Sequence, residues 1–141
     1  MKIEIGNYKD VIDSRDVISA LEEIELEREE FVQAVEDAET EEEKTAAEDD
    51  LMQFDEERDY LALKNLDNDG EEIFYEWKEG TILIRESFFT EYIAELCADV
   101  GDLPRDLPWH IARNIDWEGL ASDLQSDYSS IEFDGITYWG R

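Results

Sequence analysis

Four residues with side-chain oxygens near the middle of the chain have the spacing of a calcium-binding loop. They are Asn65, Asp67, Asp69 and Glu76. With Gly70 at the sixth position they follow the EF-hand order, but Glu72 is charged where an apolar residue is usual and Gly80 would end an exiting helix early. We therefore expect a turn over residues 67–70 and no bound metal.

Nucleophilic catalysis has only Cys97 and His110 as candidates, because the chain holds one cysteine and one histidine. A reactive thiolate needs a cationic or helix N-terminal setting, whereas Cys97 lies between Leu96 and Ala98 in an acidic region. We interpret both residues as structural, and no phosphate-binding or metalloprotease motif is present. The prediction is a protein that is not an enzyme and has no cofactor.

Carboxylates crowd residues 14–66, which hold 20 Asp and Glu against 5 Lys and Arg, a net charge of −15. Folded into two helical arms of about 38 Å, this segment would carry about one carboxylate per 1.9 Å, or one net charge per about 2.5 Å. Duplex DNA carries about one phosphate charge per 1.7 Å. Ordinary solvated coiled coils mix the two signs instead, so the crowding indicates a function.

The carboxylates predicted to bind a partner lie outside the apolar positions of both arms. They are Glu22, Glu25, Glu29, Glu36, Glu43, Asp49, Asp50, Glu56 and Glu57.

Two apolar repeats with steps of four and three predict an antiparallel, coiled-coil-like helical hairpin over residues 14–66. The first repeat contains Val17, Leu21, Ile24, Phe31, Val35 and Ala38, and the second contains Ala47, Leu51, Phe54 and Leu61. Arg28 and Arg58 fill the gaps, so each should pair with a carboxylate such as Glu25 or Asp55. Leu21 and Leu51 should be buried.

Capping signals place the ends of these helices. Asp13 or Ser14 can cap the first helix. Thr40 with Glu43 has the form of a capping box, which predicts that the second helix starts after a break near residues 39–44.

The rest of the chain predicts a compact α+β body made of residues 1–13 and 67–141, and we expect residues 1–141 to form a single domain. Expected elements are a strand at 1–5, a connector at 6–13, a β-hairpin of 73–77 and 81–85, a helix at 87–101, a helical turn within 109–115, a helix starting at Asp116, and a hairpin of 130–133 and 136–139 around Asp134-Gly135.

Charge and hydropathy limit the possible partners and location. The net charge of −29 repels nucleic acid and anionic membranes, so direct binding to either is not expected. No apolar run approaches the roughly 20 residues that span a bilayer, and no signal-peptide pattern is present at the start. A single cysteine fits a reducing compartment. We expect a cytoplasmic protein.

The last 35 residues, LPWHIARNIDWEGLASDLQSDYSSIEFDGITYWGR (107–141), resemble the closing segment of ArdA-type antirestriction proteins. The shared features are a Leu-Pro pair, an Ile-Asp-aromatic-Glu helix start, a Leu-rich turn and a final hairpin that ends in an aromatic and a basic residue. The resemblance implies a very acidic, non-catalytic mimic of duplex DNA that occupies the DNA groove of Type I restriction-modification enzymes, often as a dimer.

Two functions follow as hypotheses. The first is a DNA-mimic inhibitor, carried by a phage or mobile element, whose carboxylates occupy the basic DNA-binding cleft of a host defence protein. The alternative is an interaction module in which the helical hairpin docks a protein partner and the charge serves only solubility. Acids on one continuous face with phosphate-like spacing would favour the first.

Overall fold

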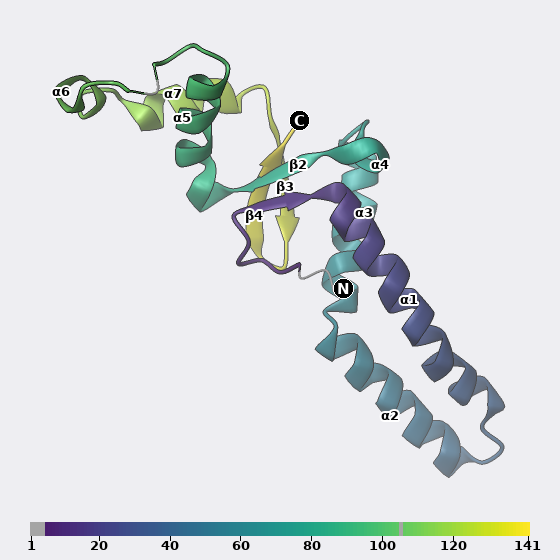
Figure 1. Cartoon of the computed structure of the whole chain (residues 1–141). Helices are drawn as coiled ribbons and strands as arrows, with labels where there is room; N and C mark the ends of the chain where they lie inside the picture. Colours follow the sequence, from purple (N-terminus) through teal and green to yellow (C-terminus); the bar gives the residue numbers. More distant parts are fainter. Residues whose placement is uncertain (1–4, 105) are drawn as a thin grey trace.

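The computed structural model describes residues 5–104 and 106–141 and combines helices with one antiparallel sheet (Figure 1). Its strands are β1 (Val11–Asp13), β2 (Ile82–Arg85), β3 (Ser129–Phe133) and β4 (Ile136–Gly140). Its helices are α1 (Ser14–Asp37), α2 (Glu41–Glu57), α3 (Tyr60–Ile73), α4 (Trp77–Gly80), α5 (Phe89–Asp99), α6 (Trp109–Ala112) and α7 (Trp117–Gln125), with a 3-10 turn η1 (Glu86–Phe88) before α5. The predicted α+β class is confirmed.

The sheet has the strand order β1-β2-β4-β3 and separates two hydrophobic cores. Neighbouring residues of a strand point to opposite faces. Leu83 and Tyr138 accordingly belong to one core with α1 and α3, whereas Ile84 and Trp139 belong to the other with α5 and α7. Helices α1 and α2 extend from one side of the sheet, and α5–α7 lie at the other end of the molecule (Figure 1).

Several elements agree with the sequence. The final hairpin turns at Asp134 and Gly135 with φ of +48° and +82°, as a two-residue type I′ turn requires. Asp116 accepts a hydrogen bond from the Gly119 amide and caps α7. The predicted helix at 87–101 and the helical turn within 109–115 correspond to α5 and α6, with Gly101 just past the end of α5 at φ +88°.

The start of α1 is tied to the sheet through a buried serine. Asp13 caps the helix by accepting from the Arg15 amide, so Ser14 is free for another role. Its hydroxyl donates to the Trp77 carbonyl at 2.7 Å and accepts from the Thr81 amide at 2.7 Å, and its own amide donates to the Thr81 carbonyl. These bonds fix the first turn of α1 to the segment that leads into β2.

Helix α2 begins as predicted, but the second arm is not one helix. Thr40 accepts from the Glu43 amide, and the Glu43 carboxylate accepts from the Glu39 amide. After Arg58 the chain turns at Asp59, which adopts a left-handed conformation with φ +51° and caps no amide with its side chain. The predicted repeat therefore fails at Leu61, which lies on α3 and is 73% exposed.

The predicted turn at residues 67–70 is wrong, because α3 continues through it to Ile73. Asp67 and Gly70 lie about one helical turn apart, and the Trp77 side chain packs against both. Its indole nitrogen donates a hydrogen bond to the Asp67 carboxylate at 2.8 Å. A Cβ on Gly70 would lie 2.5 Å from the Trp77 ring. The residues that resemble a turn in the sequence are therefore the site where helix α3 and the Trp77 indole are in close contact.

The predicted strand at 73–77 is also wrong, whereas its expected partner at 81–85 forms β2. Phe74 and Trp77 are buried in the first core, and the chain reaches β2 through the short helix α4. Strand β2 pairs instead with β4 and with β1, which lies inside the predicted connector. The predicted strand at 1–5 lies outside the described residues except for Ile5, which is in no strand.

Burial of the two predicted core leucines differs. Leu21 is 4% exposed and packs in the first core, as predicted. Leu51 is only half-buried, because α2 extends beyond the sheet and contacts α1 along one side. Leu51 is therefore not the core residue that its place in the repeat indicated.

Replacing Gly70 with alanine should lower the free energy of unfolding by about 1–3 kcal/mol, because the new methyl group overlaps the Trp77 ring. Helix propensity alone predicts the opposite sign, a gain of about 1 kcal/mol. Asn68→Ala, at an exposed position of the same helix, is the control and should be neutral or slightly stabilising. Urea unfolding followed by circular dichroism measures both, and a stabilised Gly70→Ala variant would contradict the contact.

Replacing Ser14 with alanine should cost about 1–3 kcal/mol, because the buried Trp77 carbonyl and Thr81 amide both lose their partner. Ser19→Ala removes an exposed hydroxyl from the same helix and should change stability by less than about 0.5 kcal/mol. Equal unfolding midpoints for the two variants would show that the Ser14 bonds do not stabilise the junction.

Candidate functional site

All nine carboxylates predicted to bind a partner are exposed on α1 and α2 or their ends. Helical spacing divides them. Steps of three, four and seven place the α1 members on one flank of that helix, and steps of seven separate two rows on α2. The α1 members are Glu22, Glu25, Glu29 and Glu36; one α2 row is Glu43, Asp50 and Glu57, and the other is Asp49 and Glu56. The nine therefore do not share one face.

Two rows of carboxylates instead border a shallow hollow between the ends of α1 and α2. Glu43 and Asp50 line it from α2, and Glu30 and Asp37, which the sequence analysis did not select, line it from α1. In each row the two acids are seven residues apart, or about 10.5 Å along the helix. The hollow has a volume of about 520 Å³, which is smaller than the groove described below.

Small side chains form the floor of this hollow. Ala34, Ala46 and Ala47 line it beside Phe31, whose ring stacks on Phe54 with centroids 4.8 Å apart. Among the described residues no ion pair neutralises the four carboxylates. The result is an apolar strip with carboxylates on both sides that no ion pair of the described residues neutralises.

The signal for Glu30 and Asp37 was present in the sequence. In an antiparallel helix pair the positions that flank the apolar seam recur every seven residues. Glu30 and Asp37 have that spacing on α1, as Glu43 and Asp50 have on α2. Reading the flanking positions of both helices together would have identified the two rows.

Cations of this region hold the helices together. Arg28 of α1 donates two hydrogen bonds to Asp55 of α2, at 2.8 and 3.1 Å. Its guanidinium carbon lies 4.6 Å from the centre of the Tyr60 ring. The bonds to Asp55 raise the pKa of the Arg28 guanidinium above its ordinary value. The predicted pairing of Arg28 with Asp55 is confirmed.

The other two cross-helix pairs use different partners from those expected. Arg58 pairs with Glu27. Glu25 pairs with Lys64 of α3 at 3.0 Å, and this hydrogen bond raises the pKa of the Lys64 ammonium. Glu25 is thus an anchor for α3 as well as a member of the predicted array.

The spacing of a calcium loop is not matched by the geometry of one. Asn65, Asp67 and Asp69 lie on helix α3 rather than around a turn, and Asp67 accepts from Trp77. Glu76 lies beyond the end of α3, just before α4. No group of three or more metal-ligating side chains occurs in residues 5–104 and 106–141.

Cys97 and His110 lie in different surroundings. Cys97 is buried in the second core with Phe89 and Ile93. His110 is exposed on α6, where its ring meets the Trp109 ring edge-on. The placement of Cys97 agrees with a small core residue, and the prediction that the protein is not an enzyme stays a prediction.

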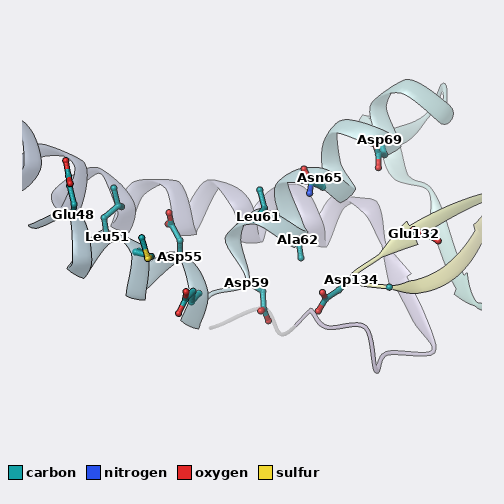
Figure 2. Close-up of a pocket in the computed structure, with 13 residues that line it drawn as sticks. Glu48, Leu51, Asp55, Asp59, Leu61, Ala62, Asn65, Asp69, Glu132 and Asp134 are labelled. Carbon is teal, nitrogen blue, oxygen red and sulfur yellow. The ribbon is translucent and has the colours of Figure 1, made fainter. Parts of the chain in front are cut away.

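A second concave surface is a groove of about 880 Å³ between α2, α3 and the turn of the β3–β4 hairpin (Figure 2). Leu51 and Met52 of α2 and Leu61 and Ala62 of α3 supply its apolar lining. Asp134 approaches from the hairpin turn. The groove exists because the chain bends at Asp59 and α3 packs beside β3.

Replacing Arg28 with glutamine should lower the free energy of unfolding by about 1 kcal/mol, because a partly buried pair between two acidic helices is lost. Arg15→Gln removes the same charge from a pair with Asp13 that is more exposed and lies within one segment, so it should leave stability nearly unchanged. Urea unfolding at low salt compares the two; equal effects would mean that net charge, and not the cross-helix contact, governs stability.

No helix in the described part of the chain is both long and apolar enough to cross a membrane. No protein-family model, curated protein or solved structure matches this chain. The resemblance of residues 107–141 to ArdA-type proteins therefore stays a prediction, and the function must be argued from the surfaces described above.

Proposed function

We propose that this protein inhibits a DNA-binding protein of a host cell, in the first place a restriction-modification enzyme, by occupying its basic DNA-binding cleft. The carboxylates of α1 and α2 take the place of DNA phosphates. The protein makes and breaks no bond in this role and needs no metal or nucleotide.

The observation that carries the proposal is the pair of acidic rows on either side of the hollow between α1 and α2. Glu30 and Asp37 form one row, and Glu43 and Asp50 form the other. Duplex DNA also presents two lines of negative charge with a groove between them. A cleft that receives the DNA backbone through Lys and Arg can pair with such rows in the same way.

Charge density supports the same conclusion. Residues 14–57 contain 19 Asp and Glu against 3 Lys and Arg. The longer helix, with 24 residues, is about 36 Å long. This gives about one carboxylate per 1.9 Å, close to the one phosphate per about 1.7 Å of duplex DNA.

Rigidity would add to affinity. The acids lie on helices held by the Phe31–Phe54 stack and the Arg28–Asp55 pair, so few backbone torsions are left to order on binding. A preorganised array loses less entropy when it docks than a flexible acidic segment does. This separates the proposed mimic from an acidic tail of the same charge.

The experiment is a competition between this protein and labelled duplex DNA for a purified Type I restriction-modification enzyme at low salt. We expect displacement of the DNA, with an association rate that falls steeply as salt is added. The test variant neutralises the two rows with Glu30→Gln, Asp37→Asn, Glu43→Gln and Asp50→Asn. It should compete at least about tenfold less well, although each single change should do little.

The control variant has the same net charge as the test variant but keeps the two acidic rows. Glu86→Gln, Glu91→Gln, Glu118→Gln and Asp123→Asn neutralise four exposed acids near α5 and α7. This variant should compete as the unchanged protein does. If both variants compete equally poorly, the effect is one of net charge and not of the two rows. The proposal is overturned if the unchanged protein displaces DNA neither from this enzyme nor from any other DNA-binding defence enzyme.

A further inference from the structure

We propose that the groove between α2, α3 and the β3–β4 turn binds a cationic amphipathic helix of a partner protein. The inference goes beyond DNA mimicry, because it uses a different surface and requires apolar contact as well as charge. It stands on the shape, the lining and the charge of the groove.

The shape of the groove fits an elongated occupant. Steps of three and four separate the lining residues Glu48, Met52 and Asp55 on α2. Similar steps run through Asp59, which joins the two helices, to Ala62, Asn65 and Asp69 on α3. Residues at these steps share one face of a helix. The lining is therefore a stripe that runs along both helices and bends at Asp59, where φ is +51° (Figure 2).

Apolar side chains of the groove lining lie without cover. Met52 is 61% exposed and Leu61 is 73% exposed, although both border a concave surface. Covering them would remove apolar area from water, which favours association. Apolar residues on one face of a bound helix are the usual means of doing so.

The rim of the groove is acidic, and most of its acids form no ion pair with any residue that the structure describes. Asp55 is bound by Arg28. No ion pair is found within the described residues for Glu48, Glu56, Asp59, Asp69, Glu132 or Asp134. None of the described residues that line the groove is Lys or Arg.

This combination selects the chemistry of the occupant. A partner helix with an apolar face bordered by Lys and Arg would cover Met52 and Leu61 and bring cations to the rim on both sides. Nucleic acid and anionic membrane surfaces would be repelled by the same rim. A small cation would leave the apolar lining exposed.

The probe is a labelled synthetic amphipathic helix of leucine and lysine, compared with a peptide of the same composition in scrambled order. Both peptides carry the same charge, but only the first has an apolar face. We expect the amphipathic peptide to bind at least about tenfold more tightly in fluorescence anisotropy at moderate salt. Equal affinities would mean that binding is diffuse electrostatic attraction and would overturn the proposal.

Two pairs of variants locate the site. Met52→Ser with Leu61→Ser should weaken binding at least about tenfold. Leu26→Ser with Val100→Ser changes two other exposed apolar residues and should not. Circular dichroism checks that each variant is folded. An unchanged affinity in the folded Met52/Leu61 variant would place the binding elsewhere and refute the groove.

The acidic rim is tested by Asp59→Asn with Asp134→Asn. Asparagine tolerates the left-handed conformation that both positions adopt, so the backbone is kept while two charges are removed. Binding should weaken. Asp123→Asn with Asp127→Asn, two exposed acids in the last turn of α7 and just after it, should leave binding unchanged. Equal effects of the two pairs would contradict a local role of the rim.

These results can be separated from those for DNA mimicry. The variant that neutralises Glu30, Asp37, Glu43 and Asp50 should bind the peptide normally, and the Met52/Leu61 variant should still compete with DNA. Either proposal can therefore fail while the other stands.

Discussion

Repulsion between two acidic helices is the constraint on which the rest of this structure depends. Helices α1 and α2 lie side by side although both are densely negative. The Phe31–Phe54 stack and the Arg28–Asp55 pair oppose that repulsion from within the contact. Three of the cations in this region form ion pairs between helices. Arg28, Arg58 and Lys64 each bind an acid of another helix. Most outward acids of α1 and α2 form no ion pair with the described residues, which is what a surface that attracts a basic protein needs.

Sequence signals predicted correctly those elements that are determined by neighbouring residues in the chain. The Thr40 cap of α2, the Asp116 cap of α7 and the Asp134-Gly135 turn depend on neighbours within a few residues. Predictions failed where distant residues decide the conformation. Residues 67–70 have the composition of a turn, but Trp77 packs on Gly70 and bonds to Asp67, so the helix continues. The short strand β1 forms because β2, some 70 residues later, offers it a partner.

The candidate surfaces show the same division. The two rows beside the α1–α2 hollow follow from a spacing of seven residues, which can be read from the chain. The groove cannot, because it combines α2 and α3 with Glu132 and Asp134 from the last hairpin. Its bend rests on Asp59, a residue type that tolerates a left-handed backbone but does not require it. Sequence reasoning therefore found the charge of the molecule more readily than its concave surfaces.

The Ser14 junction has a consequence for how the chain folds. Its hydroxyl bonds to groups 63 and 67 residues away, and closing so long a loop is entropically costly for an open chain. The α1–α2 contacts join residues that are closer together in the chain, such as Arg28 and Asp55, so we expect them to form before the sheet pairs. Repulsion between the helices would then act on the folding rate: low ionic strength should slow the collapse of this segment. The acids that we propose to face a partner would thus also slow folding.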